Sequence, residues 1–287
     1  MKKLFILFSL TLVIFASCAK KATDVNTLNM VFVPASEKSD ANSFKSLMAI
    51  VTKLTKVKFN FIKVTDYNAA VEAMRSGRAD IAWFGAATYV IAADLANAEA
   101  FAAGIPKGKK DAGYYTYFVV KKDSPYKQLK DVKGTVIALN NIGSTSGDYI
   151  PQVELLRAGL NLKNKKHFKN VMYAGSHDAS LLAVVNGQAQ VCATSSHNYY
   201  GRIKDGTIKA DSIRILQKSR KIPPAPLAYS KKIPKDVRDK IKKAVLEAHK
   251  HGKISGWGGE MEKYVSVEDK DFDLMRDVKK IIESSKK

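Results

Sequence analysis

Short apolar runs rich in β-branched and aromatic residues alternate along the chain with segments whose apolar positions recur every three or four residues. The runs predict strands and the periodic segments predict helices. A first series covers residues 30–33, 44–54, 59–64, 70–74 and 81–84, and a second covers 114–120, 135–139, 147–158, 171–173, 177–185 and 191–194. This alternation predicts an α/β protein, and its two series predict two similar lobes.

A proline-rich stretch, Ile222-Pro223-Pro224-Ala225-Pro226, follows the second series. Because proline interrupts both helices and strands, we expect this stretch to cross back to the first lobe. Amphipathic patterns at 235–249 and 272–282 then predict two helices that complete that lobe. We therefore assign residues 27–115 and 222–287 to lobe 1 and residues 116–221 to lobe 2.

The pattern at the N-terminus is different. Lys2 and Lys3 precede an apolar run over residues 4–15, which is too short to span a bilayer and is typical of an export signal. Phe15-Ala16-Ser17-Cys18 is similar to a bacterial lipoprotein cleavage box, in which Cys18 becomes the lipidated N-terminus. We expect a signal peptide at 1–18, a tether at 19–26, and a lipid-anchored protein at the periplasmic or cell-surface face of the membrane. A plain secretory signal is the alternative.

Composition narrows the class of protein. An apolar content of 46% and a charged content of 26% in 287 residues are typical of a globular chain with a substantial core. The net charge of +21 raises nucleic acid as a partner. However, the lysines are spread along most of the chain without interleaved aromatics, which favours a solvated surface and no nucleic acid. Neither the five histidines nor the two cysteines have metal-ligand spacing, so we expect no metal and no cofactor. With Cys18 lipidated, Cys192 would be a single buried thiol.

The most specific local motif is Gly143-Ser144-Thr145-Ser146-Gly147, which follows the expected strand at 135–139 and opens a helix with Pro151 in its first turn. At a helix start, unpaired backbone N–H groups and the positive end of the dipole favour an anion, and three hydroxyls add neutral donors. An ordinary N-cap would need one hydroxyl. A serine elbow needs serine at the central position, which is Thr145 here, so a hydrolase is not favoured and we expect no enzyme.

Two further segments resemble a known family. Residues 66–77, from Asp66-Tyr67-Asn68 to Arg75-Ser76-Gly77, and residues 79–85, which end in Trp83-Phe84-Gly85, are similar to the signature of phosphate/phosphite/phosphonate ABC-transporter substrate-binding proteins. Gly113-Tyr114-Tyr115, Ser144-Thr145-Ser146-Gly147 and Gly175-Ser176-His177-Asp178 follow in the family's order. The resemblance implies a type II periplasmic-binding-protein fold with a mixed sheet flanked by helices in each lobe. It also implies a ligand in the interlobe cleft, closure about a hinge, and an ABC permease and ATPase as partners.

The resemblance also implies a ligand site. It places Tyr67 and Tyr114 on the first-lobe side and the hinge, and Ser144, Thr145, Ser146 and His177 on the second lobe, where their O–H and N–H groups would enclose the phosphoryl oxygens. Packing of Tyr67 and a solvent-facing His177 are the structural alternatives. Additional candidates near the cleft are Trp83, Phe84, Thr88, Tyr199 and Tyr200.

Two departures from the family pattern bear on the ligand. Members that bind aminoalkylphosphonates hold the ammonium with two carboxylates, and this sequence carries His197 and Ala225 at those positions. An unpaired buried ammonium is costly, so we expect phosphate, phosphite or a simple alkylphosphonate as ligand. The alternative function is a binder of another small solute, of sulfonate or thiamine-precursor type, or a sensor with the same fold.

Overall fold

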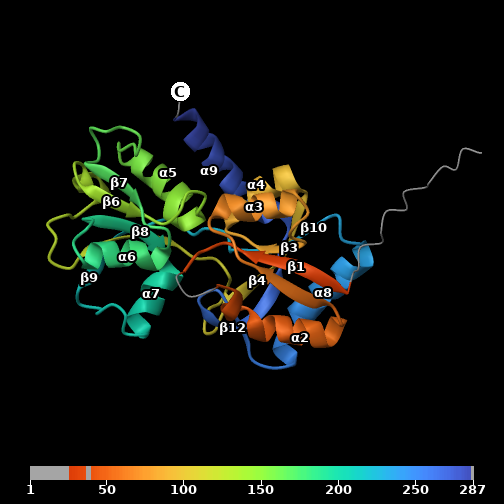
Figure 1. The fold of residues 1–287 in the computed structure, drawn as a ribbon. Coiled ribbons are helices and arrows are strands. Elements are labelled where there is room, and N and C mark those ends of the chain that lie inside the picture. The colour runs from red at the N-terminus through yellow and green to blue at the C-terminus, as the bar shows by residue number, and fades with distance from the viewer. Residues whose placement is uncertain (1–25, 37–39, 286–287) are drawn as a thin grey trace, which may run out of the picture.

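The computed structural model describes residues 26–36 and 40–285, so the expectations for the signal peptide, Cys18 and nearly all of the tether lie outside the described residues. Figure 1 shows two α/β lobes side by side, one built from the red-orange and blue parts of the chain and the other from the green middle part. The expected mixed α/β architecture is confirmed.

The larger lobe contains a seven-stranded mixed sheet in the order β11-β12-β4-β10-β3-β1-β2. Parallel pairing joins β1 to β2 and β3, and antiparallel pairing joins β10 to β3 and β4. Helices α3 and α4 pack together on one face, and α2 and α8 on the other (Figure 1). The strands are β1 (Thr27–Phe32), β2 (Lys58–Ile62), β3 (Ile81–Trp83), β4 (Ala98–Pro106), β10 (Leu227–Ser230), β11 (Ile254–Gly256) and β12 (Gly259–Ser266). The helices are α1 (Asp40–Ser43), α2 (Lys45–Thr55), α3 (Tyr67–Arg75), α4 (Ala86–Ala96), α8 (Lys235–Glu247) and α9 (Asp273–Ser284), with short 3₁₀ turns at Ala248–Lys250 and Asp269–Phe272.

The smaller lobe contains a five-stranded mixed sheet in the order β7-β6-β8-β5-β9. Its strands are β5 (Thr116–Lys121), β6 (Val136–Leu139), β7 (Asn170–Tyr173), β8 (Val191–Ser195) and β9 (Ile213–Lys218). Its helices are α5 (Ile150–Arg157), α6 (His177–Val185) and α7 (Ser196–Lys204), with a 3₁₀ turn at Leu129–Val132 and a π-helical turn, η2 (Thr145–Tyr149), directly before α5.

The smaller lobe has two hydrophobic clusters, one on each face of its sheet, and side chains of β5 point alternately into them. Tyr117 and Val119 point into a cluster beneath α6 and α7, whereas Phe118 and Val120 point into a cluster on the α5 side. Successive side chains of a strand face opposite sides of the sheet, so a run that is apolar at every position predicts a sheet covered on both faces. Cys192 is buried in the first cluster, and burial raises the pKa of its thiol.

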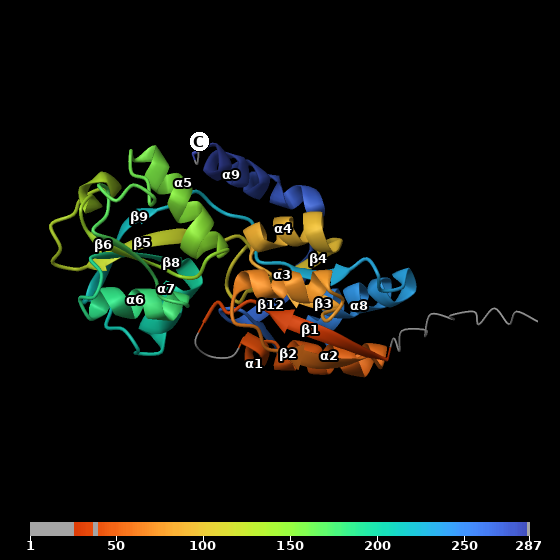
Figure 2. The same cartoon turned by 45° about the horizontal axis from the view of Figure 1, so that its top comes forward.

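Two chain crossings join the lobes, between β4 and β5 and between β9 and β10. They run side by side, because Tyr114 and Ile222 form an antiparallel bridge with amide-to-carbonyl distances of 3.3 and 2.9 Å. The lobes also touch directly: the hydroxyl of Thr88 donates to the carbonyl oxygen of Gly143 at 2.8 Å. Helix α9 of the larger lobe lies beside α5 of the smaller one, as Figure 2 shows. The two sheets are therefore held in a closed arrangement.

The β11–β12 hairpin and helix α4 were not among the expected elements. The β12 segment carries glycine and several charged residues, and only Met261 and Tyr264 are buried along it, so it lacks the alternation of a half-buried strand. Helix α4 is apolar almost all around, which removes the amphipathic signal. Both elements nonetheless contribute to the site.

Candidate anion-binding site

A small cavity of about 10 Å³ lies between the lobes, and we call it the inner chamber. All six residues expected to bind the ligand line it. No Asp, Glu, Lys or Arg is among its lining residues, which are Val33, Ala35, Tyr67, Trp83, Gly85, Tyr114, Ser144, Thr145, Ser146, His177, Ala225 and Trp257. The sequence-predicted residues therefore come together from both lobes around one uncharged cavity.

Four helix starts surround the inner chamber. Tyr67 is the first residue of α3, which Asp66 caps, and Gly85 precedes α4 without a side-chain cap. Ser144 caps the turn η2, and Ser176 caps α6, whose first residue is His177. The first N–H groups of a helix have no partner within the helix, and the dipole places partial positive charge there. The chamber is thus suited to an anion although no cation lines it.

Ser144 and Thr145 already accept hydrogen bonds from the protein. The Ser144 Oγ accepts from the Gly147 amide at 3.2 Å and from the Asn140 side-chain amide at 3.0 Å. The Thr145 Oγ1 accepts from the Ala87 amide, across the lobes, at 2.9 Å. Because both acceptor positions of the Ser144 hydroxyl are occupied, its proton is left to donate, as an oxyanion requires.

His177 is oriented by the backbone of β8. Its Nδ1 accepts from the Ser195 amide at 3.2 Å, so the ring proton belongs on Nε2, which lies 3.3 Å from the Ser146 Oγ. Burial, with a smaller effect of the nearby His197, lowers the pKa of His177 to about 3. At neutral pH the imidazole is therefore an uncharged N–H donor at the chamber wall.

The two tyrosines hold their phenolic protons. Burial raises the pKa of Tyr114 to about 12, although hydrogen bonds with Ser146 and Thr145 oppose that rise. Tyr67 is buried, and its hydroxyl accepts from the Asn140 side-chain amide at 3.3 Å. Both hydroxyls can consequently donate to a ligand oxygen at physiological pH.

Trp257 is a lining residue that the sequence reading missed. It stands in the turn of the β11–β12 hairpin, and its ring centroid lies 5.4 Å from that of Trp83 and 4.8 Å from that of His197. Gly258 and Gly259 follow it with φ of 91° and 112°, a backbone region that favours glycine. A tryptophan between glycines in Gly256-Trp257-Gly258-Gly259 was the available signal for a turn that presents an aromatic ring.

The additional candidates divide between the chamber and its surroundings. Trp83 lines the chamber, and Thr88 joins the lobes behind it through its bond to the Gly143 carbonyl. Phe84 is buried in the core of the larger lobe. Tyr199 and Tyr200 pack edge-on against Tyr117 of β5 and do not line the chamber.

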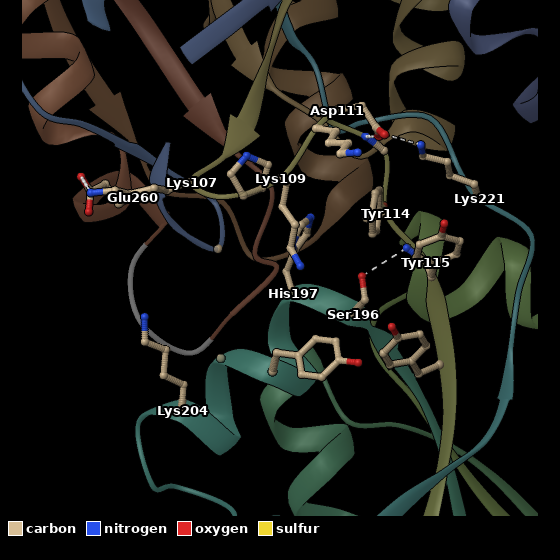
Figure 3. A pocket seen from close by; sticks show the side chains of 17 residues that line it. Lys107, Lys109, Asp111, Tyr114, Tyr115, Ser196, His197, Lys204, Lys221 and Glu260 are labelled. Atoms are coloured by element: carbon tan, nitrogen blue, oxygen red, sulfur yellow. Dashed lines mark hydrogen bonds and ion pairs between the residues drawn. The ribbon is translucent and has the colours of Figure 1, made fainter. Parts of the chain in front are cut away.

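Two of the cavities around the inner chamber bear on the ligand. A side cavity of about 20 Å³ shares Trp83, Ala225 and Trp257 with the chamber, and His197 forms part of its wall. A wide outer basin of about 520 Å³ lies beyond Tyr114 and His197, which both line it (Figure 3). His197 and Ala225 thus stand next to the expected ligand position.

No carboxylate is among the lining residues of the chamber or the side cavity. Across residues 26–36 and 40–285, no group of three or more His, Cys, Asp or Glu is placed to hold a metal ion. In the same part of the chain, no helix combines the length and apolar character needed to cross a bilayer.

Comparison with known proteins gives a family and a fold. A family model described as "ABC transporter, phosphonate, periplasmic substrate-binding protein" matches residues 30–272. The "Phosphonates-binding periplasmic protein" of Escherichia coli K12 is 30% identical over 189 residues, which are 64% of this chain and 55% of that protein. The "Phosphate-import protein PhnD" of Mycolicibacterium smegmatis is 29% identical over 224 residues, 75% of this chain and 70% of that protein. The chain thus matches between about half and about two thirds of the length of these relatives.

Among solved structures, a binding protein component of an ABC phosphonate transporter from Pseudomonas aeruginosa has a TM-score of 0.77 at 20% identity, covering 89% of this chain and 86% of that one. The PhnD1 protein of Prochlorococcus marinus in complex with methylphosphonate has a TM-score of 0.76 at 20% identity, covering 91% and 99%. These likenesses support the type II periplasmic-binding-protein fold.

Proposed function

The chain belongs to the family of periplasmic substrate-binding proteins of phosphonate ABC transporters, and we propose that it captures a small phosphorus oxyanion. Phosphate, phosphite and simple alkylphosphonates are the ligands that we propose. After capture it would deliver the ligand to an ABC permease and ATPase without chemical change. The family acts outside the cytoplasm, in transport and not in catalysis.

The observation that carries this proposal is the convergence of six neutral donor side chains on one small chamber without a charged lining residue. A hydrogen bond to a charged group contributes about 1.5–3 kcal/mol, so several donors can offset the cost of removing the anion from water. Because these donors are held at set positions in the chamber wall, the chamber selects anions by the arrangement of their oxygen atoms.

An amine on the ligand would find no partner here. Neither the inner chamber nor the side cavity has a carboxylate in its lining, and an unpaired ammonium in such a place is costly. We therefore propose that 2-aminoethylphosphonate binds more weakly than phosphite or methylphosphonate.

Isothermal titration calorimetry with phosphate, phosphite, methylphosphonate, 2-aminoethylphosphonate and sulfate tests the proposal. We expect binding of at least one phosphorus oxyanion, weakened about ten- to a hundredfold in Ser146→Ala and His177→Ala because each variant removes a donor to a charged group. Ser212→Ala is the matched control, since Ser212 lies in a turn outside the chamber and donates to the Lys209 carbonyl. A folded protein that binds only sulfate would favour the sulfonate-type alternative, and one that binds none would contradict the proposal.

We propose that ligand binding closes the lobes, with residues 27–115 and 222–287 moving against residues 116–221. The paired crossings at Tyr114 and Ile222 support this division, because they are the covalent links between the sheets. A hinge would lie there, and the bond from Thr88 to Gly143 would form on closure. Small-angle X-ray scattering should show a smaller radius of gyration with ligand than without it.

Anchoring through Cys18 is also part of the proposal, because the sequence around it is similar to a lipoprotein cleavage box. In a bacterial host, the protein should fractionate with membranes and carry acyl groups detectable by mass spectrometry. Cys18→Ser should release it into the soluble extracytoplasmic fraction. If the substitution leaves membrane association unchanged, the protein is not anchored through a lipid on Cys18.

A further inference from the structure

The lining of the inner chamber is partly polar and partly apolar. Six donor side chains from both lobes line it together with the apolar Val33, Ala35, Trp83, Ala225 and Trp257. A phosphonate whose oxygens bind the donors would place its carbon substituent against these apolar residues. Because Trp83, Ala225 and Trp257 also line the side cavity, the substituent is directed into that cavity.

His197 forms part of the wall of the side cavity. Its ring stacks on Tyr114 with centroids 5.4 Å apart and meets Trp257 edge-on at 4.8 Å. Together with Pro106, the same ring also lines the outer basin, so it stands between the side cavity and the basin. The pKa of His197 is lowered to about 4, first by burial and second by the charge of Lys109. The positive field of Lys109 therefore reaches the ring.

The outer basin is rich in cations. Five lysines line it against two carboxylates, Glu260 and Asp111. Those two carboxylates pair with Lys107 at 2.8 Å and Lys221 at 2.5 Å. Within the described chain Lys109 and Lys110 form no ion pair, and Figure 3 shows Lys109 beside His197. The net charge behind His197 is positive.

We propose that the side cavity and His197 select phosphonates whose substituent ends in a carboxylate over those that end in an ammonium or a methyl group. This inference rests on the proposed function and names the substrate class of the same site. His197 donates an N–H to the carboxylate, and Lys109 stabilises its charge from the basin.

Three ligands of equal chain length test the proposal: 3-phosphonopropionate, 2-aminoethylphosphonate and propylphosphonate, measured by calorimetry beside phosphite. We expect 3-phosphonopropionate to bind about tenfold or more tighter than 2-aminoethylphosphonate and about threefold tighter than propylphosphonate, as one hydrogen bond to a charged group and a screened Coulomb interaction allow. If phosphite binds and 2-aminoethylphosphonate equals or exceeds 3-phosphonopropionate, the inference fails while the proposed function stands. If no phosphorus compound binds, both fail.

Charge variants test the mechanism. His197→Asp should reverse the order of the carboxylate and ammonium ligands, and His197→Asn, which stays neutral, should reduce the preference without reversing it. Lys109→Gln should weaken 3-phosphonopropionate about threefold and leave propylphosphonate unchanged. Lys107→Gln is the matched control, because it removes the same formal charge from the same basin at a lysine already paired with Glu260. Equal losses in both lysine variants would mean that the basin acts only through net charge, and would overturn the proposal.

Discussion

The inner chamber and the outer basin share a wall, Tyr114, yet they present opposite surfaces to an anion. The chamber has about 10 Å³ of space and only neutral donors, whereas the basin has about 520 Å³ and five lysines. Charge at exposed lysines of the basin is screened by water and salt, so it distinguishes poorly between one anion and another. The hydroxyls and helix starts of the chamber belong to buried residues, so they act in a lower dielectric.

The difference shows why a net charge of +21 was a poor guide to the ligand site. The basic side chains lie around the site, and the groups proposed to contact the phosphorus oxyanion are uncharged. Recognition by such groups depends on how tightly the lobes meet. Most of the following predictions disturb either that closure or the charge state of His177 and His197.

The largest effect is expected from Gly85→Ala, which opposes closure of the chamber. A Cβ on Gly85 would lie 2.8 Å from the Thr145 Oγ1 of the other lobe, although its φ of −70° is acceptable for alanine. Thr145 can relieve this clash only by turning its hydroxyl away from the Ala87 amide. Overpacking of a core typically costs about 1–3 kcal/mol. We therefore expect the affinity for the ligand to fall about ten- to a hundredfold, as measured by calorimetry.

Gly201→Ala serves as its control, because a Cβ there would meet no heavy atom within 4 Å and Gly201 lines the basin. Affinity for phosphite should stay within about twofold in that variant, as expected for a surface substitution. Wild-type affinity in Gly85→Ala would mean that ligand binds without the closed contact between Gly85 and Thr145.

A smaller effect is expected from Thr88→Val, which keeps the shape of the side chain and removes the bond to the Gly143 carbonyl. Gly143 is buried, so its carbonyl would lose its partner at a cost of about 1–2 kcal/mol in the closed form. We expect the ligand to bind about tenfold more weakly. The melting temperature of the ligand-free protein should not change, because we propose that this bond forms only when the lobes close on the ligand. A lower melting temperature without ligand would instead place this bond in the ligand-free state as well.

Much of the fold followed from local pattern, and the candidate site was proposed from motifs at helix starts. The strand-turn-helix at Gly143–Gly147 predicted donors for an anion, and the structure brings Ser144, Thr145 and Ser146 to the chamber. The place of Trp257 at the chamber and the contact between Thr88 and Gly143 could not be predicted, because they join segments far apart in the chain and depend on how the lobes meet. Helix α4 was missed because burial all around leaves no periodicity to detect.

The histidines of the two regions should make stability depend on pH. Burial lowers the pKa of His177 to about 3 and that of His197 to about 4, below the ordinary value of 6.5 that applies in the unfolded chain. Below about pH 6.5 the unfolded chain binds protons that the folded one does not, so the free energy of unfolding decreases as the pH falls, by at most about 1.4 kcal/mol per pH unit for each histidine. His197 is partly exposed and should contribute less.

Urea unfolding at pH 7, 6 and 5 measures this slope. His177→Gln should flatten it, and His251→Gln, at an exposed position, should leave it unchanged. An identical slope in wild type and His177→Gln would show that His177 titrates normally in the folded protein, and the neutral-donor role would then need revision.

The smallest effect is expected from a substitution of Tyr200, which we compare with one of Tyr114. Tyr200 lines the basin and is 54% exposed, whereas Tyr114 lines both regions and is buried. Tyr200→Ser should therefore change phosphite affinity by less than about twofold, as is usual for surface substitutions. Tyr114→Phe, which loses a buried donor, should weaken it about tenfold. If Tyr200→Ser costs as much as Tyr114→Phe, phosphite contacts the basin wall, and the neutral chamber does not by itself determine which anion is bound.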